Sequence, residues 1–204
     1  MGHGPGCGIL KGMPPVSANP VPGNTLPPPR DLNRPYHVCF VCLGNICRSP
    51  AAEVVARTLL AKAGLTKAGL DQAVVVDSAG TGDWHVGEGM NSGSRAALAS
   101  RGYDGDGHRA RQFDPSWRPD LILAMDKSNF KNLKSLYRTP RAISAQPIDD
   151  AARVRLFGDV TSLNGAEVPD PYGGTPEDFD HVIDMLESAM PSLINQLAAV
   201  SRRG

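Results

Sequence analysis

The sequence predicts an α/β domain with a three-layer αβα architecture, in which helices cover both faces of a four-stranded parallel sheet. Short apolar runs at residues 38–41, 74–78, 121–125 and 154–157 alternate along the chain with segments of helical pattern. Strands separated by helices form βαβ units, whose strands run parallel and end at one edge of the sheet. A long amphipathic segment at residues 176–200 supplies a final helix to cover one face.

Residues 1–35 differ in composition from the rest of the chain. They contain nine prolines and almost no periodic apolar pattern, which predicts a disordered extension rich in proline and glycine. Residues 36–204 are then the folded domain. The extension is compatible with a tether, with an over-extended start of translation, or with a proline-rich ligand at residues 27–30 for an aromatic groove of a partner. The first two are the simpler interpretations.

The first strand leads into a small polar loop and then into a helix. The apolar run at residues 38–41 is typical of a strand buried on both faces. Gly44 and Asn45 tolerate the left-handed backbone that a tight loop requires. Ser49 is predicted to cap the next helix, and Pro50 suits its first position. Because the N–H groups of the loop converge with a helix N-terminus, we expect a phosphate-binding loop after the first strand.

Two side chains of this loop predict a reaction rather than binding alone. Cys42 stands where the strand ends, and Arg48 follows six residues later. A helix N-terminus and a guanidinium both favour the thiolate form of a nearby thiol, and the planar guanidinium matches two oxygens of a phosphoryl group. A buried cysteine followed by a surface arginine occurs readily by chance, but the glycine, the asparagine and the helix start favour a nucleophile beneath a phosphoryl group.

The remaining elements follow from hydrophobic periodicity and from the positions of glycine and proline. Helices are predicted over residues 50–63, 94–101, 127–137 and 175–200, and further strands over residues 74–78, 121–125 and 154–157. Gly64 and Gly102 close the first two of these helices. The pattern leaves residues 139–152 undetermined. Pro191 is predicted to bend or split the last helix, because proline lacks the N–H that a helix interior requires.

Charge and cysteine content narrow the class of protein. The formal net charge is +0, so no overall field attracts nucleic acid or an anionic membrane. No apolar run approaches the length of a transmembrane helix, and the first residues lack the pattern of a signal peptide. Four cysteines, three of them close together, do not form a secreted disulfide framework. We therefore expect a cytoplasmic protein with no nucleic-acid and no membrane partner.

The same cysteines do not predict a metal or redox centre. His37, Cys39, Cys42 and Cys47 are possible zinc ligands by type, but strand alternation directs Cys39 away from the centre of the loop. Cys39 and Cys42 also imitate a Cys-x-x-Cys redox motif, yet they lie in an apolar strand rather than at a helix start. We therefore expect neither a metal nor a cofactor.

Residues 41–50, Val-Cys-Leu-Gly-Asn-Ile-Cys-Arg-Ser-Pro, resemble the signature of the low-molecular-weight protein tyrosine phosphatases. The second motif of that family, Asp-Pro-Tyr, is matched at residues 170–172. The resemblance covers residues 36–200 and continues through residues 77–81, 84–87, 108–112 and 124–126. Two motifs in the correct order are a specific signal. They imply a low-molecular-weight phosphatase domain over residues 36–204 that hydrolyses phosphotyrosine in proteins and small aryl phosphates.

The resemblance also implies a mechanism. The Cys42 thiolate attacks phosphorus and forms a phosphocysteine intermediate. Arg48 and the backbone N–H groups of the loop stabilise the phosphoryl oxygens. Asp170 donates a proton to the leaving tyrosine oxygen and later accepts one from water. The loop residues expected to bind the substrate are Leu43, Gly44, Asn45, Ile46 and Cys47.

Two aromatic residues are expected to form the walls of the pocket. Trp84 and Tyr172 match family positions that restrict the site to a long, flat phenyl phosphate. In many family members a second aromatic residue follows the tyrosine, whereas this chain has Gly173 and Gly174. We therefore expect one wall to be lower or more mobile.

Further residues are expected to hold the loop and the thiolate by hydrogen bonds: Asn45, Ser49, Ser78 and His108. Each is equally compatible with a helix cap or an ordinary loop residue. Cys47 either packs in the loop or traps oxidised Cys42 as a reversible disulfide. Asp126 matches a family position near the site but has no assigned role.

Three alternatives share parts of this pattern. Arsenate reductases of one class resemble this fold and loop but use further downstream cysteines; no cysteine follows Cys47, so such an enzyme would need an external thiol. Phosphoarginine hydrolysis goes with threonine at the position of Ile46, which instead favours an aromatic ring. A non-catalytic phosphotyrosine-binding module would not need Cys42, Arg48 and Asp170 together. The expected partners are tyrosine-phosphorylated proteins, with phosphate or other oxyanions in the loop.

Overall fold

The computed structural model describes residues 25–66, 73–137 and 147–201. Its centre is a sheet of four parallel strands in the order β2-β1-β3-β4. The strands are β1 (Tyr36–Cys42), β2 (Val74–Gly80), β3 (Leu121–Ala124) and β4 (Val154–Leu156). Val38 of β1 lies opposite Val76 of β2 and Leu121 of β3. The predicted parallel sheet is confirmed, and each predicted strand is present.

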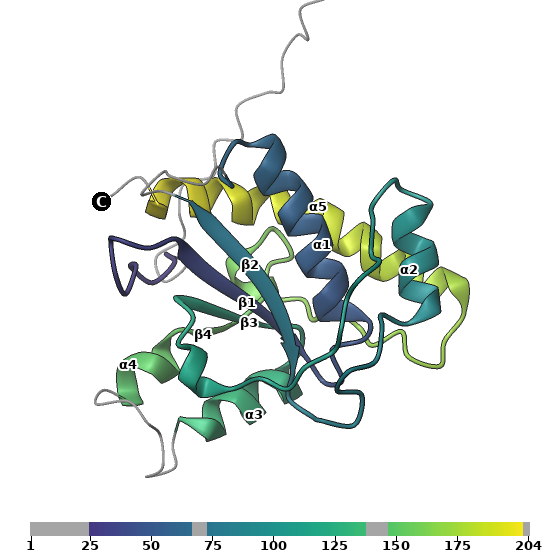
Figure 1. The fold of residues 1–204 in the computed structure, drawn as a ribbon, viewed down its shortest axis with the longest axis horizontal. Coiled ribbons are helices and arrows are strands. Elements are labelled where there is room, and N and C mark those ends of the chain that lie inside the picture. The colour runs from purple at the N-terminus through teal and green to yellow at the C-terminus, as the bar shows by residue number, and fades with distance from the viewer. Residues whose placement is uncertain (1–24, 67–72, 138–146, 202–204) are drawn as a thin grey trace, which may run out of the picture.

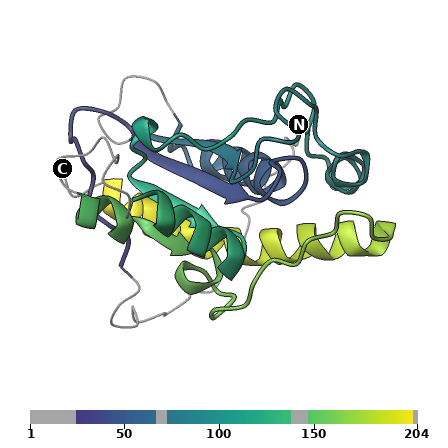
Figure 2. The same cartoon turned by 90° about the horizontal axis from the view of Figure 1, so that it is seen from below.

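Helices lie on both faces of this sheet, which confirms the three-layer architecture. One face carries α1 (Arg48–Lys62) and α5 (Pro176–Ser201), with α2 (Ser92–Ala99) packed on both (Figure 1). The other face carries α3 (Lys127–Leu136) and the short α4 (Pro147–Ala152). Figure 2 shows the same layers from below, with α3 towards the viewer. No helix in the described ranges is both long enough and apolar enough to span a bilayer.

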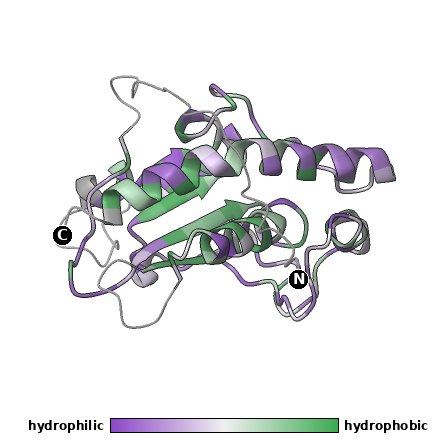
Figure 3. Ribbon diagram, turned by 90° about the horizontal axis from the view of Figure 1, so that it is seen from above, coloured by the Kyte–Doolittle hydropathy of each residue, from purple (hydrophilic) through white to green (hydrophobic). Residues whose placement is uncertain are grey.

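The side chains of β1 alternate between two hydrophobic cores. Val38, Phe40 and Cys42 pack in the larger core with α1 and α5, whereas Cys39 and Val41 pack in the smaller core beneath α3. Figure 3 shows hydrophobic residues, in green, along the strands between the helical layers. The sulfur atoms of Cys39 and Cys42 therefore belong to opposite faces of the sheet, as strand alternation predicts.

Helix α1 begins earlier than its sequence predicts. Its first residue is Arg48 and its N-cap is Cys47, whose side chain makes no capping hydrogen bond. The prediction that Ser49 caps this helix is therefore wrong. The hydroxyl of Ser49 lies within reach of the sulfur of Cys42 instead. The helix ends at Ala63, followed by Gly64 with a φ of 72°, as the glycine predicts.

Two other helices differ from the prediction in detail. Helix α2 starts at Ser92 because the side chain of Asn91 accepts a hydrogen bond from the N–H of Gly93. Helix α5 runs through Pro191 without a break, so the predicted split is not observed. Leu186 and Met190 before the proline and Leu193 after it are all fully buried, and this packing holds the two halves of α5 on the same core.

The chain contacts the domain before residue 36. The N–H of Arg30 donates to Asp120 at 2.6 Å, and its guanidinium forms an ion pair with buried Asp150. Tyr36 donates to the carbonyl of Pro27 at 2.8 Å. Residues 26–30 therefore pack against the start of the sheet rather than extend away from it. Residues 1–24 of the predicted extension lie outside the described residues, as do residues 139–146 of the undetermined segment.

Candidate active site

The Cys42 loop, residues 43–47, joins the end of β1 to the start of α1. Its carbonyl groups accept hydrogen bonds from outside the loop: Leu43 from the N–H of Gly82, and Ile46 from the N–H of Asn91. Peptide N–H and C=O groups point in opposite directions, so the N–H groups that follow these carbonyls face the interior of the loop. They donate to no protein acceptor in the described part of the chain. The loop therefore offers converging N–H donors to an anion.

A pocket of about 280 Å³ opens over this loop. Its wall includes Cys42, Arg48 and Asp170, three residues that lie far apart in the sequence. The other lining residues come from the loop, from the segment after β2 and from the segment that leads into α5: Leu43, Gly44, Ile46, Cys47, Trp84, His85 and Tyr172. The structure thus brings the predicted nucleophile, cation and acid into one cavity.

Arg48 is held by two carboxylates. Its terminal nitrogens donate to Asp126 and to Asp170, each at 2.6 Å, and to the carbonyl of Val168 at 3.3 Å. Its Nε is buried and has no protein partner in the described residues. Asp126 also caps α3 by accepting from the N–H of Asn129 at 2.7 Å. This fixes the role that the sequence leaves open for Asp126: it anchors Arg48 to the start of α3.

Asp170 lies beside the pocket on a segment tied to β3. The N–H of Val168 donates to the carbonyl of Met125 at 2.9 Å, which fastens the chain two residues before Asp170. One oxygen of Asp170 contacts Arg48, and the other accepts from the N–H of Tyr172 at 3.3 Å. The Asp170 side chain is 42% exposed, so it faces both the guanidinium and the mouth of the pocket.

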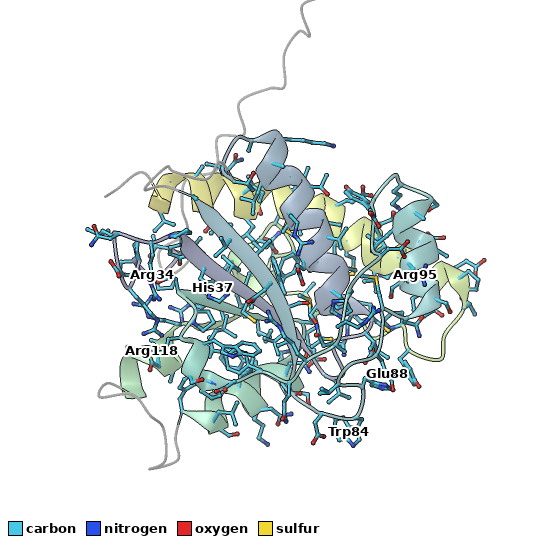
Figure 4. The ribbon with its side chains drawn as sticks, in the orientation of Figure 1. Arg34, His37, Trp84, Glu88, Arg95 and Arg118 are labelled. Atoms are coloured by element: carbon cyan, nitrogen blue, oxygen red, sulfur yellow. The ribbon has the colours of Figure 1, made fainter. Side chains whose placement is uncertain are left out.

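Two exposed aromatic residues flank the mouth. Trp84 is 69% exposed and Tyr172 is 61% exposed, and both line the pocket, as the wall prediction requires. Trp84 lies with Glu88 on the loop after β2, at the opposite end of the sheet from Arg34 and His37 (Figure 4). A side chain at Gly82 would come within 1.8 Å of the indole of Trp84, so this glycine allows the ring to fold over the backbone.

The sequence prediction missed His85, which also lines the pocket. The centroids of the His85 and Tyr172 rings are 6.0 Å apart, and Nδ1 of His85 lies 2.8 Å from a carboxylate oxygen of Glu88. A Cβ added to Gly44 would meet the imidazole at 2.8 Å. His85 therefore connects the loop to the Tyr172 wall. The sequence feature that could have predicted His85 as a pocket residue was its position next to Trp84 in the glycine-rich segment.

Asn45 is the centre of the support behind the loop. It is fully buried and has a φ of 55°. Its amide nitrogen donates to Ser49 at 3.0 Å and to Ser78 at 2.9 Å, and its amide oxygen accepts from the N–H of Arg111 at 3.0 Å. His108 donates from Nε2 to its carbonyl at 2.7 Å. The four residues predicted to support the loop thus form one network.

Ser49 extends this network to Cys42, the predicted nucleophile. Its hydroxyl oxygen lies 3.1 Å from the sulfur of Cys42 and 3.1 Å from the carbonyl of Ala79. Because the amide of Asn45 already donates to this oxygen, the single hydroxyl proton is free to point to either acceptor. Ser49 can therefore donate a hydrogen bond to a thiolate at Cys42.

Two further supporting residues were not predicted. Glu53 accepts from the hydroxyl of Ser78 at 2.6 Å, and Arg111 donates from Nε to the carbonyl of Ser78 at 2.9 Å. Glu53 lies one turn after Ser49 on α1, a spacing that places both on the same side of the helix. That spacing was visible in the sequence, whereas the position of Arg111 depends on the path of the loop after α2.

Burial sets the protonation state of two residues near the loop. It raises the pKa of the Cys47 thiol to about 12, although a hydrogen bond with Ser94 acts in the opposite direction. It also lowers the pKa of His108, against the effect of its hydrogen bond to Asn45. At neutral pH Cys47 is therefore a thiol, and His108 is a neutral imidazole that carries its proton on Nε2.

Comparison with known proteins places these features in a family. Residues 37–203 match the family model described as low molecular weight phosphotyrosine protein phosphatase. A low molecular weight protein-tyrosine-phosphatase of Streptomyces coelicolor is 44% identical over 164 residues, which cover 78% of this chain and 92% of that protein.

Solved structures agree with the family model. A protein tyrosine phosphatase of Entamoeba histolytica with Hepes in its active site superposes with a TM-score of 0.67 and 37% identity, over 79% of this chain and 96% of that one. Wzb of Vibrio vulnificus in complex with benzylphosphonate has a TM-score of 0.63 and 25% identity, over 78% and 97%. The chain, with its Cys42 loop beneath Asp170, belongs to the low molecular weight protein tyrosine phosphatases, a family of cysteine-dependent hydrolases.

Proposed function

We propose that this protein hydrolyses phosphotyrosine in proteins, and small aryl phosphates, through a phosphocysteine intermediate at Cys42. The observation that carries the proposal is the meeting of Cys42, Arg48 and Asp170 in one pocket above converging N–H groups. A nucleophile, a cation for the phosphoryl oxygens and an acid for the leaving group are the three parts that such a reaction needs.

In the first step, the Cys42 thiolate attacks phosphorus as the bond between phosphorus and the tyrosine oxygen breaks. The electron pair of that bond passes to the oxygen, and Asp170 in its acid form supplies the proton that makes it a phenol. Arg48 and the loop N–H groups stabilise the charge on the phosphoryl oxygens. Asp126 holds one terminal nitrogen of Arg48, and the Nε of Arg48 has no partner among the described residues, so this N–H remains available to a phosphoryl oxygen.

In the second step, water attacks the phosphorus of the phosphocysteine. Asp170, now a carboxylate, accepts a proton from that water, inorganic phosphate forms, and the sulfur of Cys42 leaves as a thiolate. The hydroxyl of Ser49 donates a hydrogen bond to this sulfur and stabilises its negative charge. The enzyme returns to its starting state without a metal or a cofactor.

The shape of the pocket supports an aryl substrate. Trp84, His85 and Tyr172 form the rim, so a phenyl ring can lie between apolar surfaces while its phosphate reaches the loop. The benzylphosphonate bound by the related Wzb also joins a phenyl ring to a phosphoryl group through one linking atom. Ile46 lies on the same wall and adds apolar surface. We further propose that the substrates are tyrosine-phosphorylated cytoplasmic proteins, since the three described cysteines are free thiols.

The test is metal-free hydrolysis of para-nitrophenyl phosphate across pH by the wild type, Cys42→Ser and Asp170→Ala. We expect Cys42→Ser to abolish turnover and Asp170→Ala to reduce kcat by about 10²- to 10⁴-fold, the range of general acid catalysis. Asp83→Asn, at an exposed position near the mouth, is the matched control and should retain activity.

Trapping of ³²P-labelled enzyme by acid quench tests the intermediate itself, which should be absent in Cys42→Ser. Full activity of Cys42→Ser would contradict the proposal. An inactive wild type that reduces arsenate with an added thiol would identify a reductase instead. An inactive wild type that retains phosphotyrosine binding would identify a binding module.

A further inference from the structure

A second cleft lies behind the Cys42 loop and shares no lining residue with the pocket above it. This rear cleft has a volume of about 380 Å³ and lies between α1 and the segment 104–111. The side chains in its wall that matter here are Glu53, Arg57, Ser78, His108, Arg109 and Arg111. It is therefore a polar cleft that adjoins the residues supporting the loop.

The carboxylates in the wall of the rear cleft already accept bonds from the protein. Glu53 forms an ion pair with Arg57. Asp104 accepts from the N–H of Asp106 at 2.9 Å, and Asp106 forms an ion pair with Arg95 at 2.7 Å. The acidic side chains are thus partly neutralised, which makes the cleft a poor site for a cation.

Two arginines in the same wall keep unused donors. In the described part of the chain, Arg57 uses one guanidinium nitrogen, towards Glu53, and Arg109 uses one, towards the carbonyl of His108. No carboxylate of the described residues lies within ion-pair distance of Arg109. A guanidinium with free N–H groups matches the oxygens of a phosphate or a carboxylate. The rear cleft therefore favours a small anion.

The wall of the rear cleft is joined to the nucleophile through Asn45. His108 donates to the carbonyl of Asn45 at 2.7 Å, and Ser78 accepts from its amide at 2.9 Å. The same amide donates to Ser49, whose hydroxyl lies 3.1 Å from the sulfur of Cys42. A ligand that changes the hydrogen bonds of His108 or Ser78 therefore affects the Cys42 loop through Asn45.

We propose that the rear cleft binds a small organic phosphate or carboxylate and that this ligand increases turnover at Cys42. A negative charge near His108 favours the imidazolium, and a charged donor makes a stronger hydrogen bond to the Asn45 carbonyl than a neutral one. That bond holds Asn45 at the positive φ that the loop requires. By linkage, the factor by which the rear ligand raises the affinity of the loop for an oxyanion is the factor by which an oxyanion in the loop raises the affinity of the rear cleft.

Calorimetric titration of the full chain with citrate and, separately, with glucose 6-phosphate tests binding. One equivalent of orthovanadate occupies the Cys42 loop and leaves the rear cleft open, so the heat reports on the rear cleft. We expect one equivalent of at least one probe to bind, with an affinity about fivefold higher in the presence of vanadate. The tighter probe identifies the carboxylate or the phosphate as the preferred chemistry. This measurement needs no turnover, so it is independent of the proposed function.

Variants separate this site from other surface charges. Arg109→Gln should weaken binding by about tenfold, because it removes charged donors to the ligand. Arg34→Gln, an exposed arginine near the other end of the sheet (Figure 4), should bind like the wild type. Absence of saturable binding by both probes, or equal binding by Arg109→Gln, would overturn the proposal.

The kinetic test rests on the proposed function. The tighter probe should raise kcat for para-nitrophenyl phosphate by about fivefold in the wild type. His108→Asn should bind the probe and lose the activation, because an amide cannot become a cationic donor. Binding without any change in kcat would overturn the coupling to Cys42, and purely competitive inhibition would place the probe in the catalytic pocket.

Discussion

Ser49 is part of a helix and, in the proposed mechanism, also takes part in the reaction. It lies in the first turn of α1, accepts from Asn45 and reaches the sulfur of Cys42. Replacing it by alanine should lower kcat for para-nitrophenyl phosphate by about 10- to 100-fold, since a hydrogen bond to a charged group contributes about 1.5–3 kcal/mol. KM should change little because the loop N–H groups remain.

Steady-state kinetics of Ser49→Ala and of Ser135→Ala measure this effect. Ser135 is an exposed serine of α3 whose hydroxyl donates to the carbonyl of Asn132 within its own helix, so its loss should leave kcat unchanged. A threonine at position 49 retains the hydroxyl and should recover part of the activity. Equal kcat values for Ser49→Ala and the wild type would show that the sulfur does not depend on this bond.

His108 should make the protein less stable in acid. Burial lowers its pKa in the folded state, so the unfolded chain takes up the proton first as the pH falls. The free energy of unfolding should therefore fall as the pH drops below about 6.5, the ordinary value for histidine, until the folded-state pKa is reached. Above that window His108 is neutral in both states and has no such effect.

Urea unfolding of the wild type and of His108→Asn at several pH values from neutral to mildly acidic measures this contribution. The variant should lose less stability on acidification than the wild type does. His181→Asn, at an exposed position on α5, should follow the wild-type pH dependence. Parallel curves for the wild type and His108→Asn would contradict the prediction.

The proposed catalytic residues could be predicted from the sequence, whereas several residues that surround them could not. Cys42, Arg48 and Asp170 belong to short motifs whose residue types carry the chemistry. Arg111 and His85 reach the site from loops, where no periodicity fixes the direction of a side chain. The prediction that Ser49 caps α1 is wrong, because Cys47 is the N-cap and the hydroxyl of Ser49 lies against the sulfur of Cys42.

Among the elements, α2 depends on a glycine that obscured its start in the sequence. A Cβ at Gly93 would lie 2.6–2.8 Å from three atoms of the Phe179 ring on α5. Gly93→Ala should therefore force the two helices apart and destabilise the protein by about 1–3 kcal/mol, as overpacking does. The higher helix propensity of alanine offsets only part of this loss.

Thermal and urea unfolding of Gly93→Ala, Phe179→Leu and the double variant separate strain from other causes. Leucine is smaller than the ring, so the double variant should lose less stability than the sum of the two single changes. Additive losses would mean that the contact with Phe179 is not the source. Because Asn91 precedes α2 and bonds to Ile46 of the loop, kcat should fall with stability.

Three residues at helix N-termini have two roles, because each is the N-cap residue of its helix and also contacts the site. Asp126 caps α3 and holds Arg48, Cys47 is the N-cap of α1 and lines the pocket, and Asn91 caps α2 and bonds to the loop. The element types and their order were predictable from periodicity. The first residue of each helix was not predictable, because which side chain caps the helix depends on the tertiary contacts of that side chain.

For the whole molecule, the segment 26–30 should contribute to stability. Arg30 pairs with Asp150, and both side chains are almost fully buried. Arg153 donates to the carbonyl of Pro28 at 2.9 Å, so the segment is held at Pro28 as well as at Arg30. Arg30→Ala should destabilise the protein by about 3–5 kcal/mol, the effect of breaking a buried ion pair.

Urea unfolding of Arg30→Ala and Arg34→Ala tests this contribution. Arg34 lies four residues later, is exposed and forms no ion pair with a described residue, so its loss should have little effect. Activity of both variants under native conditions should equal that of the wild type, because the segment lies at the end of the sheet away from the pocket. Equal unfolding midpoints for the two variants would show that the segment does not stabilise the domain.

The sequence by itself determined the fold class and the loop that carries Cys42, the proposed nucleophile, because these depend on local patterns: apolar runs of strand length, helical periodicity and residue types at fixed spacing. The tertiary structure decided what surrounds them. Glu53, His85 and Arg111 join the site, and residues 26–30 join the domain, through contacts between segments far apart in the chain. Such contacts depend on how loops pack on the finished sheet, and no local pattern encodes that packing.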